Sequence, residues 1–241
     1  MDYFDEIILS FLNQFAQRSW TFDNLMVRIS GNDLLKGGLV MAVLWWIWFA
    51  HDQKVIGRRT RETVLATLIG AFGAEFLARI LALTLPFRLR PTHNPELVFR
   101  LPYGAELTAV DRWSSFPSDH AALFFGLATG LLFISRRQGF FGFFYVFTII
   151  VIPRMYRGLH YPTDMIGGAV LGMVSVGLAN MPIIKNSVTK PILNWSQKHP
   201  PSFYAFFFLL TFQVATLFDG MRGIAGFIFK FIMKMVFQNE V

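Results

Sequence analysis

The chain has 241 residues, of which 54% are hydrophobic and only 15% charged, whereas a soluble domain usually carries about a quarter charged residues. Its net charge of +7 accompanies apolar blocks of membrane-spanning length, so the basic residues fit loops that meet anionic lipid better than a nucleic-acid interface. The lack of cysteine excludes disulfides, thiolate metal sites and cysteine nucleophiles. We therefore expect an all-α, multi-span transmembrane helix bundle.

The first segment, residues 1–33, mixes apolar and polar side chains. Asp2, Asp5 and Glu6 stand where a cleaved signal peptide carries Lys or Arg, so cleavage is not expected. The pattern over 3–29 fits one or two amphipathic helices lying at the membrane interface better than it fits a span.

A transmembrane domain is predicted over residues 34–220, with six apolar segments long enough to cross a bilayer. These segments are about 34–50, 63–86, 121–135, 139–155, 163–184 and 203–219. The tail, 221–241, repeats Phe and Ile around two lysines. It is expected to be an interfacial helix or an extension of the sixth span, and the sequence leaves both open.

Basic loops set the expected orientation in the cell membrane. Loops 51–62 and 185–202 and the tight turn near Arg136 share one side of a six-span bundle, and all are basic, so we expect them in the cytoplasm. Loop 87–120 and turn 156–162 then face the periplasmic or extracellular side. They carry arginines too, against the rule, which points to an anionic ligand on the outer face.

Three polar clusters converge on that outer face, because the ends of spans two and four and the starts of spans three and five meet there. They are FRLRPTHN with Arg88 and Arg90, FPSDHAA with Ser118, Asp119 and His120, and PRMYRGLHYPTD with Arg154, His160 and Asp164. Guanidinium groups and helix N-termini bind phosphate oxygens. Histidine serves as a nucleophile or general acid near neutral pH, and a neighbouring carboxylate fixes its tautomer. The clusters together predict a site for making and breaking a phosphoryl bond.

Each cluster also has an ordinary structural explanation. Ser118 and Asp119 are favoured helix caps, and Pro162 suits the first position of a helix. Arg90 fits a cationic anchor at the membrane surface, and His160 with its neighbouring carboxylate fits an interfacial pair. Singly these explanations are adequate, but a phosphate site accounts for all of the residues at once.

A metal site is the remaining interpretation of the polar residues. Two histidines and two aspartates form an acceptable ligand set, namely His120, His160, Asp119 and Asp164. Two arginines in the same pocket would repel a cation. We therefore expect neither a metal nor another cofactor.

The three clusters resemble the signature of the type 2 phosphatidic acid phosphatase (PAP2) superfamily, which is Lys-x6-Arg-Pro, Pro-Ser-Gly-His and Ser-Arg-x5-His-x3-Asp. The chain supplies Arg90-Pro91, then Pro117-Ser118-Asp119-His120, then Arg154-x5-His160-x3-Asp164. The resemblance spans about residues 34–184, and a three-part match at this spacing is specific. Three positions depart from the signature: Leu83 replaces the lysine, Asp119 the glycine and Pro153 the serine.

The three departures from the signature change what is expected of individual residues. Arg79 follows Glu75 by four residues in the second predicted span, and pairing across one helical turn is the favoured interpretation. Arg79 and Arg88 are also the candidates to supply the cation that Leu83 lacks. The PSDH form resembles the branch that includes bacterial undecaprenyl-diphosphate phosphatases, so Asp119 is expected to tune substrate preference.

The resemblance implies a metal-independent membrane phosphatase with a phosphohistidine intermediate. By family analogy, His160 attacks phosphorus, Asp164 orients His160, and His120 protonates the leaving oxygen and then activates water. The groups implied to hold the phosphate are Arg90, Arg154, Ser118 and backbone N–H groups near Asp119.

The substrate is expected to be a lipid phosphate, with undecaprenyl diphosphate as first choice and phosphatidate or phosphatidylglycerol phosphate as alternatives. The competing function of another class is a non-enzymatic lipid-phosphate binder or transporter. A transporter should show polar residues through the depth of the bilayer, and few are present beyond Glu75 and Arg79. Membrane lipids are the other expected partners, nucleic acid is not, and the oligomeric state is left open.

Overall fold

The computed structural model describes residues 3–50, 54–106, 113–220 and 227–228, and the regular structure of these residues is helical. The helices at the N-terminal side are α1 (Tyr3–Asn13), α2 (Trp20–Gly31), η1 (Leu34–Gly38), α3 (Leu39–Phe49), α4 (Lys54–Thr84) and η2 (Pro91–His93). They are followed by α5 (Asp119–Ile134), α6 (Arg136–Tyr145), η4 (Val146–Val151), α7 (Ile152–Tyr156), α8 (Pro162–Ala179), α9 (Pro182–Lys198) and α10 (Pro200–Ala215). Apart from 227–228, the predicted tail 221–241 lies outside the described residues.

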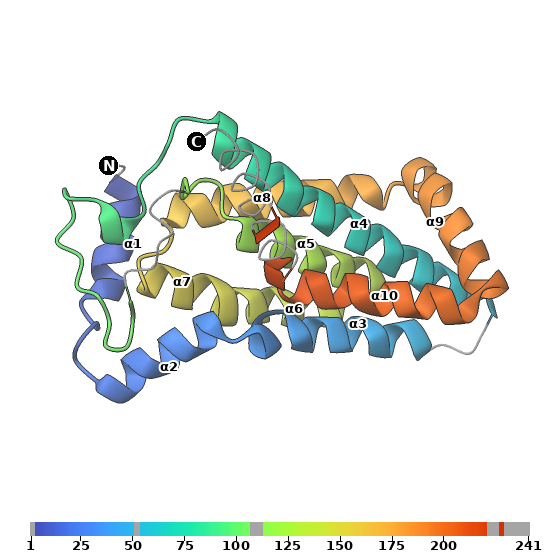
Figure 1. Cartoon of the computed structure of the whole chain (residues 1–241), viewed down its shortest axis with the longest axis horizontal. Coiled ribbons are helices and arrows are strands. Elements are labelled where there is room, and N and C mark those ends of the chain that lie inside the picture. Colours follow the sequence, from blue (N-terminus) through green and yellow to red (C-terminus); the bar gives the residue numbers. More distant parts are fainter. Residues whose placement is uncertain (1–2, 51–53, 107–112, 221–226, 229–241) are drawn as a thin grey trace, which may run out of the picture.

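The apolar helices run along the long axis of an elongated bundle (Figure 1). Helices α1 and α2 and the connection between α4 and α5 gather at one end, and α9 lies at the other end (Figure 1). This arrangement puts the N-terminal helices at the same end of the bundle as the starts of α5 and α8.

The apolar helices coincide in position with the six predicted segments. Within the described residues, three helical stretches are long and apolar enough to cross a membrane, namely Ile56–Thr84, Arg136–Tyr156 and Pro162–Ala179. Three shorter apolar helices are Leu34–Phe49, Asp119–Ile134 and Pro200–Ala215. The chain is thus an all-helical membrane protein with several candidate spans.

Two details of the sequence prediction are wrong. The predicted loop 185–202 is mostly helix, because α9 occupies Pro182–Lys198 and packs against α4. The fifth predicted segment ran to residue 184, whereas α8 ends at Ala179. Pro182 has no N–H to donate to the preceding turn, so it ends one helix and occupies the first turn of the next.

Two helices in the first 31 residues agree with the amphipathic segment that the sequence predicts over 3–29. Helix α1 packs against α7 and α8, and α2 packs against α7 and η1. Their location at the membrane interface stays a prediction.

Helix α5 forms the centre of the bundle and contacts α4, α6 and α8. Glycines on α8 permit the close approach of α8 to α5: a Cβ atom at Gly172 would lie 2.0 Å from the carbonyl oxygen of Ala122, and one at Gly168 would lie 2.3 Å from that of Ser118. Small residues four apart are a common solution for close helix packing in membranes. The two helices consequently begin side by side, and the Ser118 N–H donates to the backbone oxygen of Asp164 at 3.1 Å.

Candidate functional site

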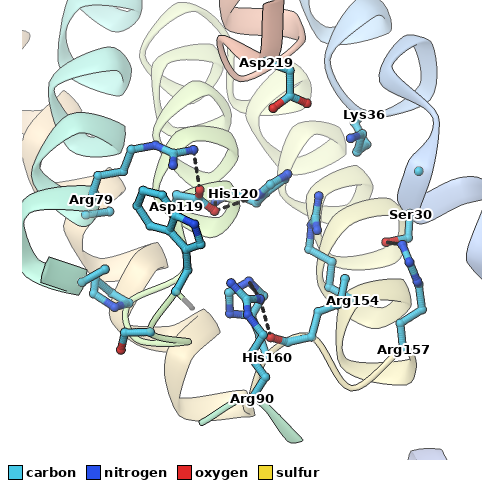
Figure 2. Close-up of a pocket in the computed structure, with 17 residues that line it drawn as sticks. Ser30, Lys36, Arg79, Arg90, Asp119, His120, Arg154, Arg157, His160 and Asp219 are labelled. Atoms are coloured by element: carbon cyan, nitrogen blue, oxygen red, sulfur yellow. Dashed lines mark hydrogen bonds and ion pairs between the residues drawn. The ribbon is translucent and has the colours of Figure 1, made fainter. Parts of the chain in front are cut away.

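A cavity of about 530 Å³ opens beside the first turn of α5 and the turn that precedes α8. Five basic residues line it: Lys36, Arg79, Arg90, Arg154 and Arg157. Two histidines, His120 and His160, and two acidic residues, Asp119 and Asp219, also line it (Figure 2). The cavity thus brings together residues from all three predicted clusters and carries an excess of positive charge that suits an anion.

His160 lies in the turn before α8 and is held by its Nδ1 atom, which is 2.9 Å from the backbone oxygen of Ser115. A carbonyl oxygen only accepts hydrogen bonds, so the proton is on Nδ1 and the Nε2 lone pair is available when the ring is neutral. Nε2 faces the cavity, with Nη1 of Arg90 3.5 Å away. Arg90 is itself fixed by donation from Nη1 to the Leu159 oxygen at 2.8 Å.

The charge state of His160 follows from its surroundings. Burial lowers the pKa of His160 below its ordinary value, and the positive charge of Arg90 lowers this pKa further, whereas the Asp164 carboxylate opposes the change. The ring is therefore neutral at pH values where an exposed histidine is already partly protonated, which favours a role as nucleophile.

Asp164 is fully buried, and its nearest contacts are not with His160. Its Oδ2 accepts from the Tyr161 N–H at 2.8 Å and lies 3.6 Å from Nδ1 of His160. Its Oδ1 pairs with Nη1 of Arg88 at 2.6 Å, and Nη2 of Arg88 pairs with Asp5 at 2.5 Å. Asp164 therefore caps α8 and joins it to α1 through an arginine, and it reaches His160 only as a longer contact.

Asp5, in α1, is the second acidic partner of Arg88. Its side chain is buried and accepts from both the N–H and the hydroxyl of Thr163, at 2.9 and 2.7 Å. Arg88 stacks over the ring of Tyr161, with its Cζ atom 4.2 Å from the ring centroid. Arg88, one candidate replacement for the missing lysine, is thus engaged behind the cavity wall and does not line the cavity.

His120 and Asp119 form a second, more direct histidine–carboxylate pair in the first turn of α5. Nδ1 of His120 lies 2.7 Å from Oδ1 of Asp119, and Oδ2 of Asp119 accepts from Arg79 at 2.8 Å (Figure 2). Glu75 is 3.7 Å from the same arginine, so the predicted pair across one helical turn of α4 is present. Asp119 is thus in direct contact with His120, and its expected role in substrate preference stays a prediction.

Ser118 lies behind the cavity wall rather than in it. Its hydroxyl accepts from the Ala121 N–H at 3.4 Å, and its side chain is fully buried. These contacts are those of a helix cap, and the direct role of Ser118 in phosphate binding stays a prediction.

Arg154, at the end of the fourth predicted span, is a buried cation of the cavity, with 6% of its surface exposed. Its Nε atom has no hydrogen-bond partner within the described part of the chain. A buried guanidinium with an unmet donor is costly, and an anionic ligand in the cavity would satisfy it. Pro153, which stands where the family signature has serine, supplies no hydroxyl here, but the hydroxyl-bearing Ser114 lines the cavity.

The polar lining residues that were not among the predicted site residues include Ser30, Lys36, Arg157 and Asp219. Lys36 is the most informative, because Leu83, which replaces the signature lysine, is 72% exposed and is not among the residues that line the cavity. A single lysine inside an apolar segment is itself a signal of function, and this signal could have identified Lys36.

The arrangement is suited to transfer of a phosphoryl group. A neutral imidazole presents Nε2 to the cavity, a second imidazole is backed by a carboxylate, and guanidinium groups surround the space between them (Figure 2). These are the parts required for nucleophilic attack, proton transfer to a leaving oxygen and stabilisation of developing negative charge.

Residues 60–185 match the PAP2 superfamily. The matched region includes the three clusters, whereas Lys36 and Asp219 lie outside it.

Curated relatives match part of the chain. The bacitracin transport permease protein BcrC of Bacillus licheniformis is 30% identical over 117 residues, which are 48% of this chain and 54% of that protein. The putative undecaprenyl-diphosphatase YbjG of Escherichia coli is 28% identical over 142 residues, 59% of this chain and 64% of that protein. The lipid A 4'-phosphatase of Bacteroides thetaiotaomicron is 44% identical over 59 residues, 24% of this chain and 26% of that protein. The chain thus covers less than two thirds of each relative's length.

Among solved structures, the crystal structure of Aquifex aeolicus LpxE is similar with a TM-score of 0.51. The alignment covers 74% of this chain and 98% of that chain at 23% sequence identity. At this identity the likeness concerns the fold, and the helical architecture is that of LpxE.

Proposed function

The chain belongs to the PAP2 superfamily, and we propose that it hydrolyses a lipid phosphate or diphosphate through a phosphohistidine on His160. The observation that carries this proposal is the geometry of His160, whose Nδ1 is fixed by a backbone oxygen at 2.9 Å while Nε2 faces the cationic cavity. A histidine held in this way is oriented for attack by one nitrogen only.

The reaction proceeds in two displacements. In the first, Nε2 of His160 forms a bond to phosphorus as the bond to the leaving oxygen breaks, and His120 gives that oxygen a proton. In the second, His120 takes a proton from water, the water oxygen attacks phosphorus, the N–P bond breaks and inorganic phosphate leaves. Arg90 and Arg154 neutralise the charge that develops on the equatorial oxygens; removal of one such donor typically costs about 2.7–4 kcal/mol of barrier.

Asp119 and Asp164 support this chemistry in different ways. Asp119 stabilises the protonated form of His120 through a direct contact of 2.7 Å. Asp164 fixes the start of α8 and the turn that carries His160. No metal enters these steps, so turnover is expected to persist in the presence of a chelator.

Undecaprenyl diphosphate is the first-choice substrate, and its hydrolysis is proposed to occur at the outer face of the cell membrane. The PSDH form of the second cluster and the similarity to a putative undecaprenyl-diphosphatase support this choice. Phosphatidate and phosphatidylglycerol phosphate are the alternatives.

The experiment is a phosphate-release panel with purified protein in detergent micelles. Prenyl diphosphates, prenyl monophosphates, phosphatidate and phosphatidylglycerol phosphate are supplied separately, with and without a chelator. Release from at least one of them, unchanged by chelator, is the expected result. Release from none would contradict the proposal, and loss of turnover on chelation would contradict metal independence.

A second candidate, a non-enzymatic lipid-phosphate transporter, is favoured by the replacements at Leu83 and Pro153 and by the name of one relative, a transport permease. Transport of labelled lipid into vesicles without phosphate release would favour it. Turnover in the panel above would exclude it as the whole function.

A further inference from the structure

The cavity extends beyond the residues that the proposed reaction uses. His120, His160 and Arg90 lie on one side of it, and Lys36 and Arg157 lie on the other, beside α2 and η1 (Figure 2). Arg154 lies between the two groups in this view and interacts electrostatically with both Arg90 and Arg157. The cavity therefore has cationic groups in excess of those that one phosphoryl group near His160 needs.

Lys36 enters the cavity from a part of the chain far from the three clusters. It lies in the π-helical turn η1, where Gly37 allows the backbone to approach α10: a Cβ atom at Gly37 would lie 2.1 Å from the oxygen of Ala215. Single π-helical turns often occur at functional sites. The Lys36 side chain is only 8% exposed, and its ammonium group pairs with Asp33 at 2.8 Å.

Arg157 approaches the same space from the turn after α7. Its Nη1 atom donates to the Ser30 hydroxyl at 3.2 Å, and its Nε atom is buried without a hydrogen-bond partner among the described residues. Burial lowers the pKa of Arg157, which reflects the cost of keeping this charge out of water. The buried ammonium of Lys36, the buried guanidinium of Arg154 and the half-buried guanidinium of Arg157 face one cavity and repel each other unless an anion lies between them.

Asp219 is the acidic residue that faces these cations, in addition to Asp119 on the other side (Figure 2). Asp33, the partner of Lys36, is about half exposed and is not part of the cavity wall. Among the described lining residues, two carboxylates stand against five basic side chains, which leaves an excess of positive charge after Asp119 is paired with Arg79.

We propose that Lys36 and Arg157, with the Ser30 hydroxyl, form a second anion subsite that binds the non-reacting phosphoryl group of a diphosphate lipid. The inference rests on the proposed function, since it assigns the reacting phosphoryl group to His160, Arg90 and Arg154. In the first displacement, Nε2 of His160 forms a bond to the terminal phosphorus, the bridging P–O bond breaks, and His120 gives the bridging oxygen its proton. The lipid monophosphate that leaves stays paired with Lys36 and Arg157.

The test compares two substrates of one lipid chain, a farnesyl diphosphate and a farnesyl monophosphate. The full chain, Lys36→Met, Arg157→Gln and the control Lys190→Met, an exposed lysine on α9, are assayed in the same micelles. We expect the ratio of kcat/KM for diphosphate to that for monophosphate to fall about 10- to 100-fold in the first two variants, as for the loss of a charged hydrogen-bond partner. The control ratio should stay within about twofold. An equal loss for both substrates would overturn the proposal, since it would place Lys36 at the reacting phosphoryl group.

A binding measurement keeps this proposal separate from the proposed function. Inorganic pyrophosphate and inorganic phosphate are titrated separately into the His160→Ala variant, which lacks the nucleophile. The shift in the midpoint of thermal unfolding in detergent measures the binding of each anion. Pyrophosphate is expected to bind at least about tenfold more tightly than phosphate, and Lys36→Met in the same background to remove most of that difference. If the unsubstituted protein hydrolyses no lipid but this difference in affinity is found, the subsite is supported and the catalytic proposal fails. Equal affinity for the two anions would overturn the subsite.

Discussion

The two histidines of the cavity are supported by their carboxylates in different ways. His120 contacts Asp119 directly at 2.7 Å, and Asp119 faces the cavity and pairs with Arg79. His160 has a backbone oxygen at 2.9 Å as its nearest acceptor, and Asp164 lies 3.6 Å away. Each unit contains a histidine, an aspartate and an arginine, but the order of contacts differs.

The two kinds of contact affect different properties of the imidazole ring, namely its orientation and its charge. A backbone oxygen fixes the tautomer of His160 without placing a full negative charge against the ring, so the ring stays neutral and nucleophilic. A carboxylate against Nδ1 of His120 fixes the tautomer of that ring and favours its protonated form, which a general acid requires, whereas burial and the charge of Arg154 oppose that form. Asp164, fully buried and engaged with Arg88, serves chiefly to hold the start of α8.

The largest expected effect is that of removing the proposed nucleophile. His160→Ala should lower kcat by about 10⁴-fold or more while the protein stays folded, because the reaction then lacks its covalent intermediate. Phosphate release and size-exclusion chromatography in detergent measure the two properties. His199→Ala, which changes an exposed histidine at the start of α10, is the control and should retain full rate. Substantial turnover by His160→Ala would refute the assignment.

The contact between α1 and the start of α8, where Asp164 lies, can be tested by a substitution in α1. Asp5→Ala removes a buried partner of Arg88 and Thr163, and the free energy of unfolding should fall by about 3 kcal/mol. Thermal or denaturant unfolding in detergent measures this change. Glu6→Ala, an exposed residue of the same helix, should change stability by less than about 0.5 kcal/mol. Equal stabilities of the two variants would show that α1 does not support the start of α8.

The direct contact of Asp119 predicts an effect on rate rather than on folding. Asp119→Asn keeps the size of the side chain but removes the charge that stabilises protonated His120, so kcat should fall roughly 10- to 100-fold. Glu96→Gln, an exposed residue of the connection between α4 and α5, is the control. A variant with normal kcat and an altered choice of lipid would restore the sequence-based expectation that Asp119 tunes substrate preference.

The smallest expected effect is a shift in pH dependence. Burial and the charge of Arg90 lower the pKa of His160, so in the native chain the acid limb of kcat/KM should lie below pH of about 6.5. Arg90→Gln removes one of the groups that lower this pKa, so the acid limb should move to higher pH, with the same substrate used for both proteins. An unchanged or lower acid limb in Arg90→Gln would contradict the assignment of this limb to His160.

The sequence could predict the residues whose role depends on a helix start. His120, Asp119, His160 and Asp164 lie in or beside the first turns of α5 and α8, and short motifs such as PSDH and YPTD fix those starts locally. The adjacency of the two starts followed from the alternation of spans. The family followed from the same motifs, and the helical architecture followed from the apolar segments.

The remaining features depend on contacts between distant segments. Lys36 reaches the cavity because η1 packs against α10, and Asp5 reaches Arg88 because α1 packs beside α8. No local pattern encodes either contact. The segment 185–202 was mistaken for a loop because its polar residues and Pro191 obscure the apolar side of α9 that packs on α4.

The most direct test of the central claim is to trap the covalent intermediate on His160. The protein is mixed with a lipid substrate carrying a radiolabelled terminal phosphoryl group, the reaction is stopped at alkaline pH after one turnover, and the labelled peptide is sequenced. Label on His160, absent from His160→Ala and accumulated further in a His120 variant that activates water poorly, is the predicted result. Turnover with no label on protein, or with label on a different residue, would contradict the account.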